Sequence, residues 1–148
     1  MNNYIKESIY FFGEYLSVDV SSPLKKGFEN IYEISTRLEN KDADILHFMV
    51  AKLLWVAIGG RPNIGLGIPF LCIRGTKSAN EDKDKLRGVL KYLKYTINNK
   101  RIIGEVSLIQ LCTWDDAMYV VHPDLKIHTG GCMSFVYGVV HCIPESRN

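Results

Sequence analysis

The sequence has few of the features that mark several classes of protein. It contains only four cysteines in 148 residues, with no CxxC spacing. Secreted disulfide scaffolds are much richer in cysteine, so we expect reduced thiols in the core. No apolar run reaches the ~20 residues that span a bilayer, and the N-terminus lacks the apolar block of a signal peptide. These absences predict an intracellular protein, cytoplasmic or nuclear, with no membrane partner.

The chain also lacks a strong excess of one charge. Its 18 basic and 16 acidic side chains give a formal net charge of +2, which alone does not indicate nucleic-acid binding. Hydrophobic residues make up 47% and charged residues 23%, as in a folded globular chain. The length suits one ordinary domain.

Apolar residues at helical spacing predict helices in the first two thirds of the chain. Residues 4–16 fit a short amphipathic helix. A longer helix is expected after Asp42 or Asp44, either of which could cap it, and should end at residues 59–62, where two glycines precede Arg61 and a proline. The apolar positions of these two helices are Ile5, Ile9, Phe12 and Leu16, then Leu46, Met49, Val50, Leu53, Leu54 and Ala57.

The next segment predicts one broken helix and one regular helix. Residues 63–74 are apolar but contain Pro69, where a regular helix would lose a donor, so we expect a kink or break there. Residues 81–96 fit a regular amphipathic helix. Its buried stripe consists of Leu86, Val89, Leu90 and Leu93. The opposite side carries a basic ridge of Lys83, Arg87, Lys91 and Lys94.

The last third predicts an antiparallel sheet. Strand-like runs cover residues 101–114, 117–121 and 131–142, and the Gly130–Gly131 pair is expected in a tight turn. Helices first and strands last indicate an α+β fold, with a boundary near residues 97–101. The acidic pair Asp115–Asp116 follows the first run, so we expect a carboxylate at a strand end, where a divalent metal could bind.

Several stretches, in one order and at matching spacing, resemble the Pol polyprotein of copia-type LTR retrotransposons. They cover nearly the whole chain and include HFMVAKLLW (47–55), RPNIGLGIPFLCIR (61–74), DKLRGVLKYLKYT (84–96) and the closest match, DAMYVVHPDLKIHTGGCMSF (116–135). In the family this span runs from beyond the polymerase palm, through connecting helices, into the first strands of ribonuclease H. The sequence departs from the family at Asn63, usually Asp, and at Met118, usually a small hydroxyl residue.

The resemblance implies a helical region like the reverse-transcriptase thumb or connection over residues 1–97, followed by an incomplete ribonuclease H-like antiparallel sheet over 98–148. In the family, two Mg²⁺ ions held by carboxylates from separate elements hydrolyse the RNA strand of an RNA–DNA hybrid. Asp116 matches the first of these carboxylates, so it is the candidate catalytic and metal-binding residue. The later family carboxylates have no counterpart. We therefore expect a truncated fragment, inactive alone, with other Pol segments as partners.

A non-catalytic module that binds nucleic acid or assembles with Pol is the alternative function. Its candidate surface is the ridge of Lys83, Arg87, Lys91 and Lys94. Phosphate contacts from such a ridge would hold an RNA–DNA hybrid or a DNA backbone without sequence preference. The simpler interpretation of the ridge is a solvated helix face.

Two further sites are not supported by the spacing of the residues. The Asp115–Asp116 pair follows Thr113–Trp114 rather than the Tyr-x motif of a polymerase hairpin. The histidines and cysteines between residues 122 and 142 lack the short, fixed spacings of a structural zinc site.

Overall fold

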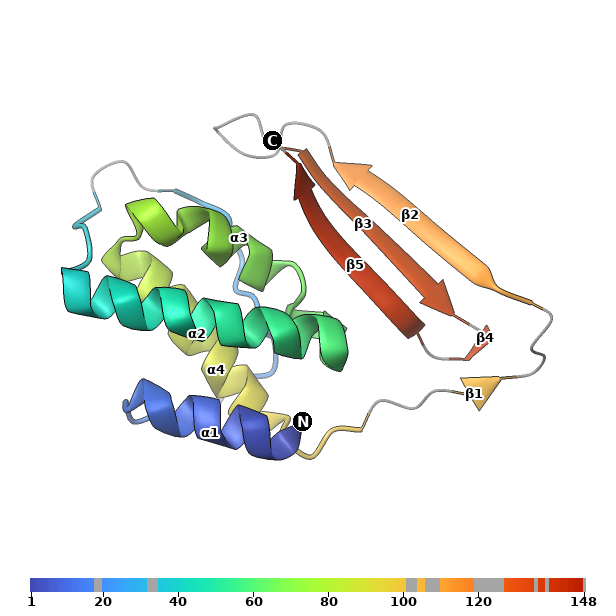
Figure 1. Ribbon diagram of the computed structural model, residues 1–148, viewed down its shortest axis with the longest axis horizontal. Coiled ribbons are helices and arrows are strands. Elements are labelled where there is room, and N and C mark those ends of the chain that lie inside the picture. Colours follow the sequence, from blue (N-terminus) through green and yellow to red (C-terminus); the bar gives the residue numbers. More distant parts are fainter. Residues whose placement is uncertain are drawn as a thin grey trace.

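Helices precede strands along the chain, as expected for an α+β fold (Figure 1). The computed structural model describes residues 1–17, 20–31, 35–100, 104–105, 110–118, 127–134, 136–137 and 139–147. The helices are α1 (Asn2–Phe12), α2 (Asn40–Gly59), η1 (Pro62–Ile64), α3 (Gly67–Arg74), η2 (Gly75–Lys77) and α4 (Asn80–Tyr95). The strands are β1 (Gly104–Glu105), β2 (Cys112–Met118), β3 (Ile127–Ser134), β4 (Val136–Tyr137) and β5 (Val139–Arg147).

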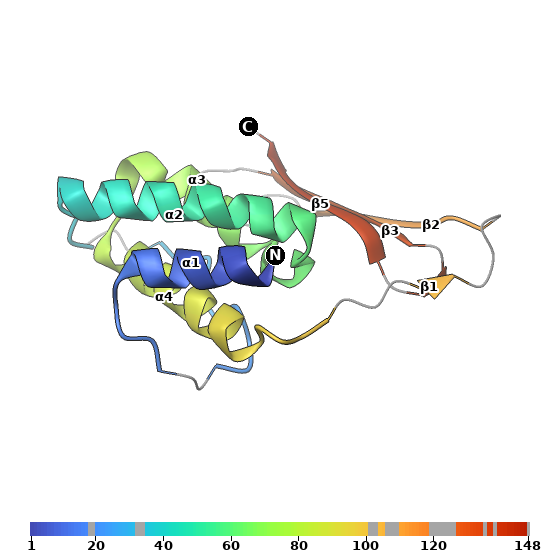
Figure 2. The ribbon, with the colours of Figure 1, turned by 60° about the horizontal axis from the view of Figure 1, so that its bottom comes forward.

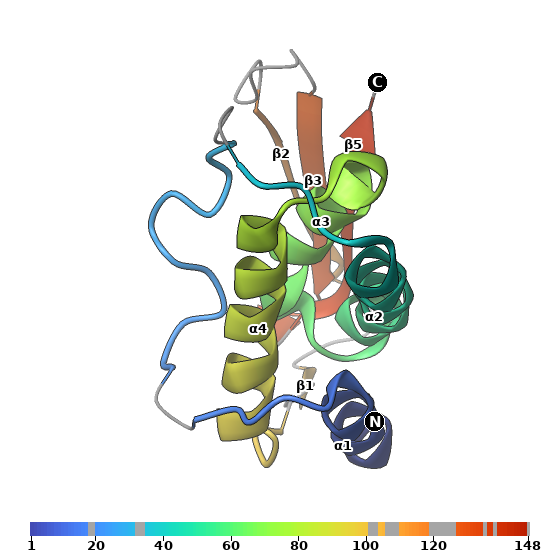
Figure 3. The ribbon, with the colours of Figure 1, turned by 90° about the vertical axis from the view of Figure 1, so that its left-hand side faces the viewer.

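Helix α2 is the centre of the helical part. It contacts α1, α3, α4 and the strand β5. Figure 3 looks nearly along α2, with α1 beneath it and α4 beside it. The side chains that α2 buries are Leu46, Met49, Val50, Leu53, Val56 and Ala57. Complete burial of such a side chain stabilises a fold by about 1.5–3 kcal/mol, so this helix supplies much of the core.

The ends of α1 and α2 differ in part from the expectation. Helix α1 stops at Phe12 rather than near residue 16, because Gly13 adopts a left-handed conformation (φ 71°) and its amide bonds to the Tyr10 carbonyl. Helix α2 begins after Glu39, with no side-chain cap. The predicted capping role of Asp42 or Asp44 is therefore wrong, and Asp42 lies in the first turn instead.

Pro69 does not break a helix, contrary to the sequence-based expectation. Helix α3 begins at Gly67, so Pro69 lies in its first turn. Backbone amides in a first turn have no partner within the helix, and a proline there costs no hydrogen bond. The interruption lies earlier in the chain, between η1 and α3, at Gly65 and Leu66. The helix α4 is confirmed with the buried stripe that its sequence predicts.

Three antiparallel strands form the main sheet, in the order β2-β3-β5. β5 contacts α2 and α3, whereas β2 forms the far edge (Figures 1 and 2). A separate two-stranded pair joins β1 to β4. The strand bounds differ from those expected, because β2 continues through Asp115 and Asp116 to Met118. Gly130 and Gly131 lie within β3, so their predicted place in a tight turn is wrong.

The described thiols are less buried than the sequence suggested. Cys72, Cys112 and Cys132 are free, but Cys72 is exposed and the other two are only partly buried. The prediction of core thiols is therefore wrong for Cys72. In the part of the chain that the structure describes, no helix combines the length and the apolar character needed to cross a membrane.

Arg61 links the turn after α2 to the end of α4 by hydrogen bonds. Its side chain is buried, and Nη1 donates a hydrogen bond to the Thr96 carbonyl at 3.0 Å. Nη2 donates to the Thr96 hydroxyl, and the guanidinium lies over the Tyr92 ring, 5.7 Å from its centroid. Among the described residues Arg61 forms no salt bridge, so these neutral groups supply its partners.

We expect Arg61→Met to lower the free energy of unfolding by about 2 kcal/mol, because hydrogen bonds to a charged group contribute about 1.5–3 kcal/mol. The measurement is urea unfolding of Arg61→Met, Thr96→Val and the double variant. A coupling energy of about 1 kcal/mol or more between the two sites would agree with a direct bond. Strictly additive effects would contradict it.

Two helical glycines provide a matched pair of alanine substitutions. A Cβ on Gly67 would lie 2.4 Å from Leu24 Cδ2 and 3.2 Å from Phe28 Cζ, whereas one on Gly88 would meet nothing within 4 Å. We therefore expect Gly67→Ala to destabilise the protein by about 1–3 kcal/mol through overpacking. Gly88→Ala should stabilise it by about 0.5–1 kcal/mol, since alanine favours the helix. Thermal unfolding of both variants measures the two effects, and equal shifts would contradict this packing.

Candidate functional site

The two acids of β2 lie opposite the two glycines of β3. Asp115 is in register with Gly131, and Asp116 with Gly130. A Cβ on Gly131 would lie 2.9 Å from Asp115 Oδ1, so the Asp115 carboxylate lies over the backbone of that glycine. A Cβ on Gly130 would meet nothing within 4 Å. The acidic pair therefore lies within a strand, opposite two glycines, and the predicted position at a strand end is wrong.

The residues around the acids do not fit the two-metal site that the family resemblance implies. Beyond the glycines, the positions in register on β5 are Ile143 and Pro144, neither of which supplies a side-chain ligand. Within the described residues no three histidine, cysteine, aspartate or glutamate side chains gather as a metal-binding group. Magnesium needs several oxygen ligands, and two ions need a shared cluster of carboxylates. We therefore derive no metal-dependent step from these residues.

The first half of the predicted basic ridge is engaged in ion pairs. Lys83 Nζ lies 2.8 Å from Asp42 Oδ2 and 3.2 Å from Glu14 Oε1. Arg87 Nε lies 2.7 Å from Glu14 Oε2, and its Nη1 also contacts Asp84. Two bases are thus matched by three acids contributed by α2, α4 and the segment after α1. This cluster joins three parts of the helical unit.

The second half of the ridge is less neutralised. Lys94 Nζ donates to the Leu16 carbonyl at 2.8 Å and lies 5.8 Å from the centre of the Tyr15 ring. Lys91 is partly exposed, and within the described residues it forms no ion pair. Among the described residues, Lys91 and Lys94 are therefore the two ridge cations that form no ion pair.

The ion-pair cluster shifts the pKa values of its members. The hydrogen bond from Arg87 holds the pKa of Glu14 below its ordinary value of 4.5, against the opposing effect of partial burial. The hydrogen bond to Asp42 raises the pKa of Lys83 above 10.5. A carboxyl group whose pKa is lowered by folding stabilises the fold above its ordinary pKa of about 4.5. This stabilisation is lost as the pH falls through the folded-state pKa.

We expect Glu14→Gln to lower the free energy of unfolding at pH 7 by up to about 1 kcal/mol, the scale of partly exposed ion pairs. The difference between the variant and the original chain should shrink as the pH falls below 4.5, where Glu14 itself becomes neutral. Glu29→Gln is the matched control, because Glu29 forms no ion pair within the described residues. Denaturant unfolding at pH 7 and pH 3 gives the values. A pH-independent loss would contradict the assigned cause.

Comparison with known proteins gives no relative. No family model matches the chain, no curated protein matches it, and no solved structure matches it.

Some residues with prominent contacts were not singled out by the sequence. In the sequence Arg61 looks like an ordinary charged residue of a turn. Its burial results from contacts with Thr96 at the end of α4, 35 residues away, which the sequence pattern does not reveal. Phe48, Lys52 and Trp55 fall outside the buried stripe of α2, and only the position of α1 brings them together with Tyr4 and Phe11. The helical spacing of Phe48 and Trp55, seven residues apart, is the signal that could have marked this exposed side of α2.

Proposed function

We propose that the chain corresponds to the connecting helices and first ribonuclease H strands of a copia-type Pol polyprotein, and that it has no nuclease activity alone. The observation that carries the proposal is the three-stranded antiparallel sheet, in which β2 holds Asp116 and leads to β3 and β5 in sequence order. The resemblance likewise implies three consecutive strands with the first family carboxylate on the first of them.

The helical part supports the same proposal. The stretch HFMVAKLLW lies wholly within α2, and the stretch 84–96 lies in α4 and the residue that follows it. The stretch 61–74 contains η1, which contacts α2, and α3, which contacts α2, α4 and β5. These three stretches therefore fall on helices of one packed unit, whereas the stretch 116–135 begins within β2 and includes β3.

The positions of the acids are the reason why we expect no activity from the 148-residue chain. Hybrid hydrolysis of this type needs a cluster of carboxylates from separate elements around two metal ions. Asp115 and Asp116 are consecutive in one strand, and their cross-strand neighbours are glycines. Two magnesium ions need more oxygen ligands than these positions supply.

The alternative of a nucleic-acid-binding module is less favoured by the geometry. Lys83 and Arg87 already face Glu14, Asp42 and Asp84, whose charges would oppose a phosphate backbone. Counterion release grows with the number of phosphates neutralised, and the two remaining cations of the ridge would contribute little.

The test is cleavage of an RNA–DNA hybrid by the purified 148-residue chain in magnesium. We expect no cleavage above that of the Asp116→Asn variant, because the described residues bring together no carboxylate cluster. Asp115→Asn is the matched control, one residue away on the same strand. Magnesium-dependent cleavage that disappears in Asp116→Asn but persists in Asp115→Asn would contradict the proposal that the chain is inactive alone.

A further inference from the structure

Helix α2 exposes apolar side chains on the side opposite its buried stripe. Phe48 is 47% exposed, Trp55 57% and Ile58 50%, and the small residue Ala51 between them is also exposed. The spacing of these four residues is that of a single helix face. A helix that is apolar on nearly all sides is normally covered on all sides, so this face of α2 lacks a cover within the described structure.

Helix α1 extends the same apolar surface. The Tyr4 ring lies 5.2 Å from the Trp55 ring, and the Phe11 ring lies 4.8 Å from the Phe48 ring. Phe11 is itself 52% exposed. We call the surface formed by Tyr4, Phe11, Phe48, Trp55 and Ile58 the aromatic face. Half-exposed rings of about 150–250 Å² each give it roughly 400 Å² of apolar surface, the size of patch that marks an interaction site.

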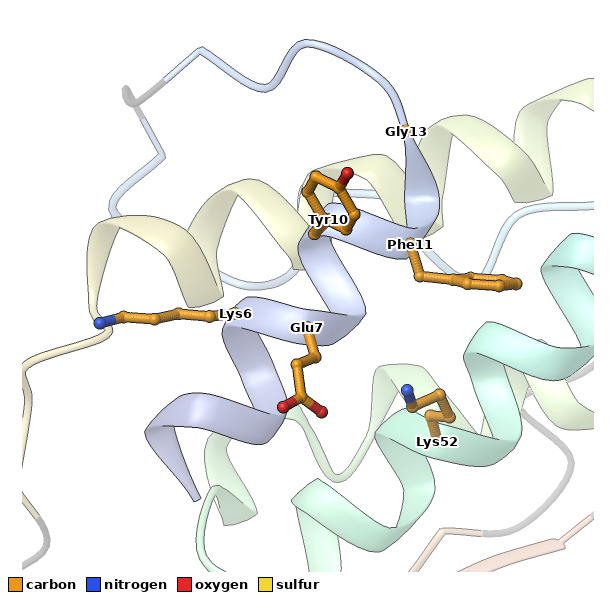
Figure 4. Close-up of a pocket in the computed structure, with 6 residues that line it drawn as sticks. All are labelled: Lys6, Glu7, Tyr10, Phe11, Gly13 and Lys52. Atoms are coloured by element: carbon orange, nitrogen blue, oxygen red, sulfur yellow. The ribbon is translucent and has the colours of Figure 1, made fainter.

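Charges of both signs lie on the aromatic face. Lys52 Nζ is 4.8 Å from the centre of the Tyr4 ring and 5.5 Å from that of Phe48. Glu7 and Lys52 line one shallow depression between α1 and α2. Figure 4 shows Glu7 extending from α1 toward α2, with Lys52 rising from α2 on the same side. In the described part of the chain neither residue forms an ion pair.

We propose that the aromatic face binds a second copy of the chain through a two-fold axis near Ala51. Ala51 lies midway between Phe48 and Trp55 along α2, so two antiparallel α2 helices crossing there would place Phe48 against Trp55 of the partner subunit. The small side chain at the crossing lets the two helices approach closely. Lys52 would meet Glu7 of the partner subunit, and the symmetry repeats that pair.

A second copy fits this face better than a polyanion does. Glu7 would repel the phosphates of a nucleic acid, whereas in a symmetric pair it meets Lys52. The ring pairs are also tilted by 57° and 49°, so they provide no row of parallel rings on which successive bases could stack. A standard interface buries about 800 Å² per partner, and the roughly 400 Å² of apolar surface would form the centre of such an interface.

The test is the oligomeric state of the full chain, measured by sedimentation over a range of concentrations. We expect a monomer–dimer equilibrium that Trp55→Glu abolishes. Lys52→Glu and Glu7→Lys should each weaken the dimer at least tenfold, because each places like charges together. The double variant Glu7→Lys/Lys52→Glu should return to within about threefold of the original dissociation constant, since it restores opposite charges.

Two controls carry the same apolar-to-acid change outside the aromatic face. Leu66 lies just before α3 and Trp114 lies on the outer strand β2, and both side chains are exposed. The control variants are Leu66→Glu and Trp114→Glu. Both variants should dimerise normally, and circular dichroism confirms that every variant is folded. A chain that is monomeric at all concentrations would overturn the proposal. So would a dimer that dissociates in Trp114→Glu but not in Trp55→Glu, or one that the double charge exchange fails to restore.

Discussion

The structure depends on the burial of helix α2. Its apolar side chains point in nearly every direction, so α1, α3, α4 and β5 all pack around it. Arg61 then fixes the turn after α2 to the end of α4, and the acids around Lys83 and Arg87 join α4 to α2 and to the segment after α1. Because α2 is apolar on most of its sides, the side around Phe48 and Trp55 remains exposed within the described structure.

This packing also determines what the charged residues can do. Lys83 and Arg87 of the basic ridge face acids because α2 and the segment after α1 lie beside α4, so these two charges stabilise the fold. The acids of β2 lie far from that cluster, on the outer strand of the sheet (Figure 1). The glycines in register with them supply no side-chain ligand. The two sets of charges therefore do not form a common site.

The sequence predicted the local elements better than their limits. The regular spacing of Leu86, Val89, Leu90 and Leu93 defines α4, and the α+β order is confirmed. Pro69 and the Gly130–Gly131 pair were misjudged, because proline is tolerated in a first helical turn and glycine in a paired strand, and neighbouring elements decide which applies. The partners of Lys83 and Arg87 depend on contacts between distant segments, which spacing cannot reveal. Residues 119–121 of the predicted strand 117–121 lie outside the described residues.

The most direct test of the Pol origin is the genomic DNA that follows the codon for Asn148. The proposal predicts that one reading frame there encodes a helix with a glutamate, then further strands with an aspartate, the remaining carboxylates of a ribonuclease H site. Asp116 would then match the first ligand of that site. If no frame encodes such a sequence, the proposed Pol origin is contradicted, and the resemblance would extend no further than the helices and strands described above.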